Sequence, residues 1–545
     1  MSWFILTQKM TSMNYNNPKR TVSLPLIIAL SLVIGILIGI YLPGKNLVPQ
    51  NASIRLKNDK LDNIIKIIEE SYVDSVNRKD LEEAAIPAML KKLDPHSVYI
   101  PAKDLKRANE PLQGNFEGIG ISFNMLTDTI LVISTIPGGP SEKAGLIPGD
   151  KIIYVNDSLV AGKKISDQDV MGMLKGPKGT IARLKVLRKG ARELVPFEIT
   201  RDKIPVYSVD VAYMLNENTG YIKINSFSVT TFDEFMKGLR ELKEKGMTKL
   251  ILDLRQNSGG VMDAAIRIAN QFLKDGQLIV YTQGRNQPRD EANATGKGEF
   301  ETGDLVILID ELSASASEIL AGAIQDNDRG TIIGRRSFGK GLVQEPIMFT
   351  DGSGMRLTIA RYFTPTGRSI QKPYNKGIDK YNEDIMVRIA RHEMEVPDSI
   401  HFSDSLKFTT PDGRTVYGGG GIMPDKFVPA DTTGISGYFL RVSNNLIYRF
   451  ALKYTESNRD VLKKFTEAGE MESYLNKQAL LDQFVQFAAN NRIKPDPAGL
   501  KTSGKIIHTQ LKAYIARNIL DNKGFYPIWD EIDSTLKYAI DFLKR

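Results

Sequence analysis

Residues 310–320 read DELSASASEIL and follow the apolar run LVILID at residues 305–310. The apolar run is typical of a buried strand, and the apolar spacing after it predicts a helix over residues 316–326. Three serines lie at this strand-to-helix turn: Ser313, Ser315 and Ser317. Unpaired N–H groups at a helix N terminus can receive negative charge that develops on a carbonyl oxygen. The turn is therefore a candidate position for a serine nucleophile.

The same residues also have a purely structural explanation. Ser315 and Glu318 match the capping-box pattern, in which both side chains satisfy N–H groups at a helix start. However, three serines alternating with alanines exceed what a cap needs. Alanine also keeps the turn narrow, which matters if another backbone must approach it.

A serine hydroxyl is a weak nucleophile and needs a base. The chain has only four histidines, and none lies in the region around the turn: His96, His392, His401 and His508. Lysine can replace histidine if apolar burial lowers its pKa from about 10.4 by several units. The candidate base is therefore a lysine beside small and apolar residues.

Lys340 has such a setting, in the stretch SFGKGLVQ at residues 337–344. The two flanking glycines permit close packing, and the phenylalanine, leucine and valine exclude water. If residues 340–344 form a strand, Lys340 and Gln344 share a face, so that the glutamine side chain can orient the amine. The alternative is an exposed surface lysine, which is the common state of this residue type.

Two other motifs near Lys340 match known patterns only in part. GRRSFGKG at residues 334–341 matches a phosphate-binding loop except at its last position, which offers no hydroxyl for Mg²⁺. The residues after Lys340 also predict a strand, where a phosphate-binding loop requires a helix. SIQK at residues 369–372 matches a penicillin-binding Ser-x-x-Lys string but lacks a predicted helix and the accompanying Ser-Asp-Asn motif.

The serine turn belongs to a longer pattern over residues 204–372. The strand-like runs TGYIKINSF, LILDLR, LVILID and TIIGR alternate with helix-like segments at residues 232–245, 262–273 and 316–326. Alternation of this kind predicts an α/β core. A polar insertion at residues 373–415 interrupts the pattern, and GIMPD at residues 421–425 is interpreted as a returning piece of the core.

Residues 114–203 consist of short β-like runs separated by glycine and proline. GIGI at 118–121, PSEKAGL at 140–146 and PGDKI at 148–152 resemble a bacterial PDZ domain in order and spacing. This resemblance implies that a peptide C terminus is bound by four residues: Gly118, Ile119, Gly120 and Ile121. The alternative is that the glycines only make tight turns.

Residues 60–430 as a whole resemble the C-terminal processing, or tail-specific, serine peptidases. That family joins a PDZ domain to an α/β core of the ClpP/crotonase type. The resemblance rests on Ser-Ala-Ser-Ala-Ser-Glu followed by Gly-Lys-Gly-x-Val-Gln. The family's separation of 25 residues between serine and lysine selects Ser315 and Lys340, and it assigns Gln344 to orienting the lysine.

The resemblance also implies an oxyanion hole and a reaction sequence. DLRQNSGG at residues 253–260 is similar to the family's glycine turn, which assigns the N–H groups of Gly260 and Ala316 to the oxyanion hole. Neutral Lys340 takes the proton of Ser315, and an acyl-enzyme forms and is hydrolysed by water that the same lysine activates. No metal and no cofactor are expected.

Residues 22–42 read VSLPLIIALSLVIGILIGIYL, carry no charge and are long enough to span a bilayer as a helix. A cleaved signal peptide and a buried helix are the alternatives. The three cations before the span, Lys9, Lys19 and Arg20, predict a cytoplasmic N terminus over residues 1–20. We therefore expect residues 21–43 to form a single-pass signal anchor in the bacterial inner membrane, with the catalytic part on the periplasmic side.

The predicted organisation after the anchor is α/β in its core and α+β overall. It comprises an N-terminal helical segment at 56–112, a PDZ domain at 113–203, a protease core at 204–432 with the insertion at 373–415, and a helical extension at 433–545. The 545 residues contain no cysteine, which excludes disulfides, thiolate metal sites and a cysteine nucleophile. The net charge of +8 is diffuse, so no nucleic-acid partner is expected.

The sequence thus predicts a membrane-anchored serine endopeptidase that recognises unstructured, apolar C-terminal tails of protein substrates. The alternative is a membrane-tethered PDZ peptide-binding protein with an inactive protease core. The insertion and the helical extension are candidate surfaces for a second copy of the chain or for an adaptor protein.

Overall fold

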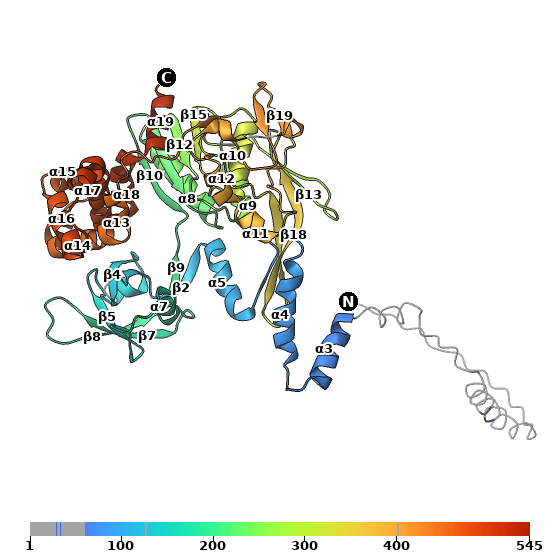
Figure 1. Cartoon of the computed structure of the whole chain (residues 1–545), viewed down its shortest axis with the longest axis horizontal. Coiled ribbons are helices and arrows are strands. Elements are labelled where there is room, and N and C mark those ends of the chain that lie inside the picture. The colour runs from blue at the N-terminus through green and yellow to red at the C-terminus, as the bar shows by residue number, and fades with distance from the viewer. Residues whose placement is uncertain (1–28, 30–32, 34–59, 126–127, 401–402) are drawn as a thin grey trace, which may run out of the picture. The chain divides into compact units, whose positions relative to one another are not determined.

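The computed structural model describes residues 29, 33, 60–125, 128–400 and 403–545 (Figure 1). The predicted anchor at residues 21–43 lies outside the described residues except for Ala29 and Val33. Among the helices that the structure describes, none combines the length and apolar character needed to cross a membrane. The chain divides into two compact units, Met1–Ala85 and Ile86–Arg545, and each is described by itself.

Two helices form in the segment that the sequence predicted to be helical, one in the first unit and one that crosses its end. Helix α3 covers Lys60–Ser71, and α4 begins at Arg78 and ends at Leu90, within the second unit. The guanidinium of Arg78 binds the carboxylates of Asp62 at 2.6 Å and Glu82 at 2.8 Å. These ion pairs fix α3 against the start of α4.

The second unit begins with elements that lead into a β-rich module. Strand β1 (Val98–Ile100) and α5 (Ala102–Gln113) come first, and the antiparallel pair β2 (Asn115–Gly118) and β9 (Asp202–Pro205) joins the module to the rest of the unit. The module has one antiparallel sheet in the order β3-β4-β5-β7-β8, with β6 paired to β5. Its elements are β3 (Ile121–Asn124), β4 (Ile130–Thr135), α6 (Pro140–Lys143), β5 (Lys151–Val155), β6 (Ser158–Leu159), α7 (Asp167–Leu174), β7 (Ile181–Leu187) and β8 (Val195–Thr200).

The core contains a six-stranded sheet in the order β10-β11-β12-β15-β16-β21. Its strands are β10 (Val209–Met214), β11 (Thr219–Ile224), β12 (Lys249–Asp253), β15 (Asp304–Ile309), β16 (Thr331–Gly334) and β21 (Lys426–Phe427). Within this sheet, β10 runs antiparallel to its neighbour and the other pairs are parallel. Strand β21 follows the GIMPD stretch, so this part of the chain does return to the core after the insertion.

Both faces of this sheet are covered. Helices α8 (Thr231–Glu244), α9 (Met262–Ala269) and α10 (Ala316–Asp326) pack on one face in the largest apolar cluster of the described residues. Alternate side chains of the strands, such as Ile251 and Val306, point to the opposite face and contact the C-terminal helix α19 (Ser534–Leu543). In Figure 1 the red α19 lies beside β15. Burial on both faces explains why β12 and β15 are continuously apolar.

A second, five-stranded antiparallel sheet was not anticipated from the sequence. It has the order β1-β18-β13-β14, with β17 paired to β18. Its further strands are β13 (Leu278–Gln283), β14 (Asp290–Asn293), β17 (Leu342–Met348) and β18 (Gly354–Phe363). Strand β1 lies in the segment that we expected to be helical. The sequence did not predict this strand, because its partner β18 is more than 250 residues away and no local pattern signals the pairing.

The insertion and the extension are both folded. The insertion contains α11 (Ile378–Asn382), α12 (Asp384–Ala390), the short 3₁₀ turns Pro397–Ser399 and Asp404–Leu406, and the pair β19 (Lys407–Thr409) and β20 (Thr415–Tyr417). The extension is helical as predicted. Before α19 it contains α13 (Gly437–Ser443), α14 (Leu446–Leu462), α15 (Ala468–Leu475), α16 (Leu480–Asn490), α17 (Pro497–Leu520), α18 (Asn522–Trp529) and the 3₁₀ turn Asp530–Ile532.

Candidate active site

Ser315 occupies the position directly before α10, the helix predicted from residue 316. Its backbone has φ 54° and ψ −114°, a conformation that non-glycine residues rarely adopt. Such strained positions persist only where the surrounding structure enforces them, and they cluster at functional sites. Ser315 is partly exposed, whereas Ala314 and Ala316 on either side are buried.

The two neighbouring serines have structural hydrogen bonds instead. Ser313 is fully buried, and its Oγ donates to the carbonyl oxygen of Leu254 at 2.9 Å. Ser317 is also fully buried, and its Oγ donates to the carbonyl oxygen of Asn257 at 2.9 Å. The geometry thus separates three serines that the residue pattern alone left equivalent.

Glu318 joins the serine turn to the loop at residues 335–341 that carries Lys340, the lysine loop. Its Oε2 accepts from the N–H groups of Ser315 at 2.9 Å and Lys340 at 2.8 Å. Its Oε1 accepts from the N–H of Gly339 at 2.7 Å and from the hydroxyl of Ser337. Burial raises the pKa of Glu318 above its usual range, and these hydrogen bonds oppose that effect. Glu318 therefore acts as more than the helix cap that the sequence suggested.

Tyr362 on β18 supplies a second link between the same two segments. Its hydroxyl donates to the carbonyl oxygen of Lys340 at 2.7 Å and lies 3.2 Å from that of Ser315. The side chain is buried in the main core cluster. No sequence signal identified Tyr362, because its role depends on the unpredicted β18.

The Lys340 amine is held by Gln344, with Nζ 3.4 Å from Oε1. Burial lowers the pKa of Lys340, and the positive charge of Arg356 lowers it further. The predicted strand is wrong in its start, because β17 begins only at Leu342 and its register shifts between Val343 and Gln344. The expected contact between lysine and glutamine is nevertheless present.

His96 belongs to this site, although its place in the sequence predicted a helical segment away from the core. It lies two residues before β1, and its carbonyl oxygen accepts a hydrogen bond from Nε2 of Gln344. The ring Nε2 lies 2.8 Å from the hydroxyl of Tyr381 in the insertion. Burial, Lys340 and Lys372 lower the pKa of His96 to about 4, so the imidazole is neutral at neutral pH.

The glycine turn lies against the serine turn. Gly259 has φ +96°, and a Cβ at this position would lie 2.7 Å from Cβ of Ser315 and 2.9 Å from the nitrogen of Ala316. Gly260 has φ +142°, and a Cβ there would lie 1.9 Å from the carbonyl oxygen of Phe227. Among the described residues, no backbone acceptor is found for the N–H groups of Gly260 and Ala316. These two groups are therefore available to a substrate oxyanion.

The residues predicted to bind a peptide C terminus lie in the β-rich module, between β2 and β3. Gly120 has φ +75°, and its carbonyl oxygen accepts from the N–H of Ile136 at 3.0 Å. Ile119 is buried, and its carbonyl oxygen accepts from both N–H and Oγ of Ser141. Gly118 ends β2 and Ile121 begins β3. This turn is thus a structured element in which the carbonyl groups of Ile119 and Gly120 are already bonded.

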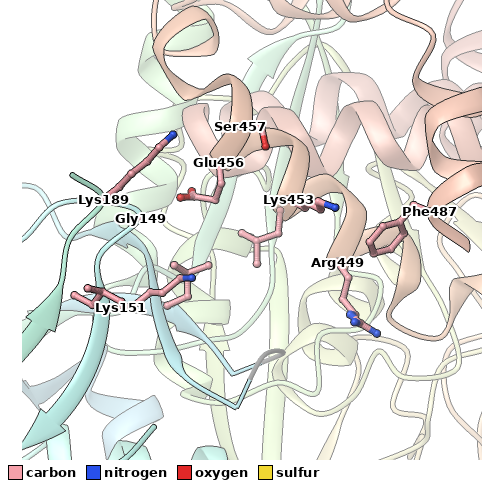
Figure 2. A pocket seen from close by; sticks show the side chains of 11 residues that line it. Gly149, Lys151, Lys189, Arg449, Lys453, Glu456, Ser457 and Phe487 are labelled. Atoms are coloured by element: carbon pink, nitrogen blue, oxygen red, sulfur yellow. The ribbon is translucent and has the colours of Figure 1, made fainter. Parts of the chain in front are cut away.

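A cavity of about 520 Å³ lies between the β-rich module and the helical extension (Figure 2). It includes Lys151 and Lys189 from one side and Arg449, Lys453 and Phe487 from the other. None of the candidate catalytic residues lines it. Among the residues that the structure describes, no group of three or more metal-ligating side chains is found.

Comparison with known protein families identifies four segments of the chain. Residues 218–381 match the model of peptidase family S41, and residues 118–199 match the PDZ domain. Residues 45–104 match the N-terminal domain of the activating protease CtpB. Residues 438–521 match a family of unknown function.

Curated relatives share about a third of the aligned residues. The carboxy-terminal processing proteases CtpB and CtpA of Bacillus subtilis are 36% and 34% identical over 326 and 364 residues. These alignments cover 59% and 66% of this chain and 66% and 76% of the relatives. The carboxy-terminal-processing protease of Bartonella bacilliformis is 37% identical over 322 residues, which cover 57% of this chain and 72% of that protein.

Proposed function

The chain belongs to the carboxy-terminal processing serine proteases of peptidase family S41, and on that premise we propose that Ser315 and Lys340 form its catalytic dyad. The observation that carries this proposal is the shared use of Glu318 Oε2 by the N–H groups of both residues. A partly exposed serine in a strained helix-start position and a lysine with a lowered pKa are what a Ser/Lys mechanism needs.

The reaction begins when the neutral amine of Lys340 accepts the proton of the Ser315 hydroxyl. The serine oxygen then bonds to the peptide carbonyl carbon, and the resulting oxyanion accepts hydrogen bonds from the N–H groups of Gly260 and Ala316. The carbon–nitrogen bond breaks as Lys340 returns the proton to the departing amine. An acyl-enzyme remains on Ser315.

Hydrolysis of the acyl-enzyme repeats these steps with water. Lys340, neutral again, accepts a proton from a water molecule that attacks the ester carbonyl. Collapse of the second tetrahedral intermediate releases the carboxylic acid and reprotonates Ser315. Gln344 Oε1 holds the Lys340 amine during both acylation and hydrolysis, because it can accept a hydrogen bond from the neutral and from the charged lysine. Neither step requires a metal or a cofactor.

Substrate selection is assigned to the PDZ domain. The N–H groups of the turn formed by Gly118, Ile119 and Gly120 bind the terminal carboxylate, and the strand beginning at Ile121 pairs with an unstructured, apolar tail. Upstream peptide bonds are thereby delivered to Ser315. The enzyme is an endopeptidase acting on protein substrates.

We also infer a location on the periplasmic side of the bacterial inner membrane, held by an anchor at residues 21–43. The support is the uncharged stretch at residues 22–42 and the three cations that precede it. The test compares the full chain with a chain starting at residue 44. Only the full chain should sediment with membranes and resist extraction at high salt, and equal sedimentation would overturn the anchor.

The dyad is tested with the full chain and a protein substrate that ends in a flexible apolar tail. Ser315→Ala and Lys340→Ala should abolish cleavage while the folded state is retained. Ser317→Ala, from the same turn, should keep cleavage because it loses only the hydrogen bond to Asn257. Cleavage by Ser315→Ala at the parent rate would overturn the assignment. Binding of the tail without any cleavage by the parent would favour the PDZ peptide-binding alternative.

A further inference from the structure

The insertion at residues 373–415 contacts the loop that carries Lys340. Arg388 of α12 donates to the carbonyl oxygens of Ser337 at 3.0 Å and Arg336 at 2.6 Å. Arg388 is almost fully buried, with 3% of its side chain exposed. The insertion therefore forms part of the wall behind the lysine loop, although the sequence suggested a polar interruption outside the core.

A second contact from the insertion reaches the partner of Gln344. The hydroxyl of Tyr381 in α11 lies 2.8 Å from Nε2 of His96, and the two rings meet edge to face with centroids 5.3 Å apart. The carbonyl oxygen of the same histidine accepts from Nε2 of Gln344, whose Oε1 contacts the amine of Lys340. Three consecutive contacts thus connect Tyr381 to the proposed base.

The turn carrying His96 is also held on its other side, through its N–H groups and Ser97. Asp94 Oδ1 accepts from the N–H groups of His96 at 2.7 Å and Ser97 at 2.8 Å. Ser97 Oγ accepts from the N–H of Thr358 on β18 at 3.1 Å. The contact between the imidazole and Tyr381 is therefore the restraint that the insertion adds to His96.

Tyr381 itself is held in place by aromatic and cationic contacts. Its ring meets that of Phe338 edge to face, with centroids 5.9 Å apart. The amine of Lys372 lies 4.2 Å from the Tyr381 centroid and 3.8 Å from that of Phe338, and it binds Asp384 at 3.1 Å. Tyr381 is 3% exposed. A buried and restrained hydroxyl is suited to orient another side chain.

We propose that Tyr381 is a positioning residue of the lysine base: it fixes His96, whose carbonyl oxygen sets the orientation of the Gln344 amide that holds Lys340. The proposal rests on the proposed Ser315/Lys340 dyad. Without the Tyr381 hydroxyl, His96 loses one restraint, and the Gln344 amide samples orientations that present its NH₂ group to the lysine. Such orientations withdraw the acceptor that holds the Lys340 amine, so turnover falls while substrate binding is unaffected.

The test measures kcat and KM of the full chain on a tailed protein substrate. Tyr381→Phe removes one hydroxyl and retains the ring, and kcat should fall about 5- to 20-fold with KM within about twofold, as expected for one lost orienting hydrogen bond. Tyr374→Phe is the matched control. It lies in the same insertion, and its hydroxyl accepts from Arg361 rather than from the chain of contacts to Lys340.

A double-mutant cycle distinguishes positioning from a general structural effect. If Tyr381 acts through Gln344, Tyr381→Phe should have no further effect on kcat in a Gln344→Ala background. The proposal would be overturned if the double variant lost kcat by the product of the two single reductions. It would also be overturned if Tyr381→Phe left kcat unchanged, or if Tyr374→Phe lowered kcat equally. Ser315→Ala is assayed in parallel. If that variant still cleaves, the dyad itself fails; if it is inactive and the cycle is additive, only the positioning role fails.

Discussion

The N–H groups of Ser315 and Lys340 donate to the same carboxylate oxygen, Oε2 of Glu318. Twenty-five residues separate the two along the chain, and the turn and the loop belong to different elements. One buried side chain thus sets the separation of the proposed nucleophile and base at the level of the backbone. Tyr362 repeats the link through the two carbonyl groups.

Glu318→Gln should therefore lower both activity and stability. A glutamine has a single acceptor oxygen, and its NH₂ group would face N–H donors that a carboxylate accepts. We expect a loss of kcat of at least about 100-fold and a loss of about 2–4 kcal/mol in the free energy of unfolding, as for a disrupted buried hydrogen-bond network. Turnover and urea denaturation measure the two effects. Glu311→Gln, which affects an ion pair with Arg335, is the control and should keep turnover near the parent value.

Arg356 should add to the effect of burial on the pH at which Lys340 becomes active. Its charge lowers the pKa of Lys340, so Arg356→Gln should raise that pKa and reduce the neutral fraction of lysine at neutral pH. The rising limb of kcat/KM against pH should shift to higher pH, and activity at pH 7 should fall. Arg361→Gln removes another cation from β18 and should leave the limb in place. A limb that does not move in Arg356→Gln would contradict this assignment.

The sequence predicted the features that depend on interactions between neighbouring residues and missed those that depend on contacts between residues far apart in the chain. Helix α10 begins and ends at the predicted residues because its cap and apolar spacing are local. The choice of Ser315 over Ser313 and Ser317 required the family's spacing, since burial of the two neighbours depends on β12 and the glycine turn. The contact of His96 with Tyr381 joins residues 285 positions apart. No local pattern encodes such a contact, so the sequence did not identify His96 as a neighbour of the site.

Gly259→Ala should inactivate the enzyme through the serine turn. The added Cβ would lie 2.7 Å from Cβ of Ser315, and φ +96° is unfavourable for alanine. The turn must move, which displaces the proposed oxyanion donors; we expect at least about a 100-fold loss of kcat, comparable to removal of an oxyanion-hole donor. Gly276→Ala is the control, because φ is +75° there but no atom lies within 4 Å of the added Cβ. Equal kcat in the two variants would contradict the close approach.

The C-terminal helix α19 should be required for stability of the protease core. Leu536 is 1% exposed and packs on the sheet face opposite α10. Leu536→Ala should reduce the free energy of unfolding by about 2–4 kcal/mol, as for other large-to-small core substitutions. Tyr538 on the same helix is 40% exposed, so Tyr538→Ala should have a much smaller effect. Similar urea midpoints for the two variants would indicate that α19 does not cover the sheet in solution.

Asp530 should make the junction between the extension and the core sensitive to pH. Burial raises the pKa of Asp530 from 3.8 to about 7, and the charges of Asp533 and Asp253 act in the same direction. The folded state therefore binds this proton more tightly than the unfolded state. The resulting stabilisation is complete below about pH 4 and is lost as the pH rises through 7.

Asp530→Asn tests this linkage, because an amide can still accept a hydrogen bond from Tyr213 and never ionises. At pH 3.5, below the unfolded pKa, the variant and the parent should have similar Tm values, because the carboxyl is largely protonated in both the folded and the unfolded state. At pH 8.5 the variant should be more stable by about 1–2 kcal/mol, a reduced figure because the carboxyl is partly exposed and Arg255 offsets its charge. Asp541→Asn on α19, where the carboxylate pairs with Lys544 at the surface, should show no such pH-dependent gain. A Tm difference that is the same at both pH values would mean that Asp530 is ionised in the folded protein across this range.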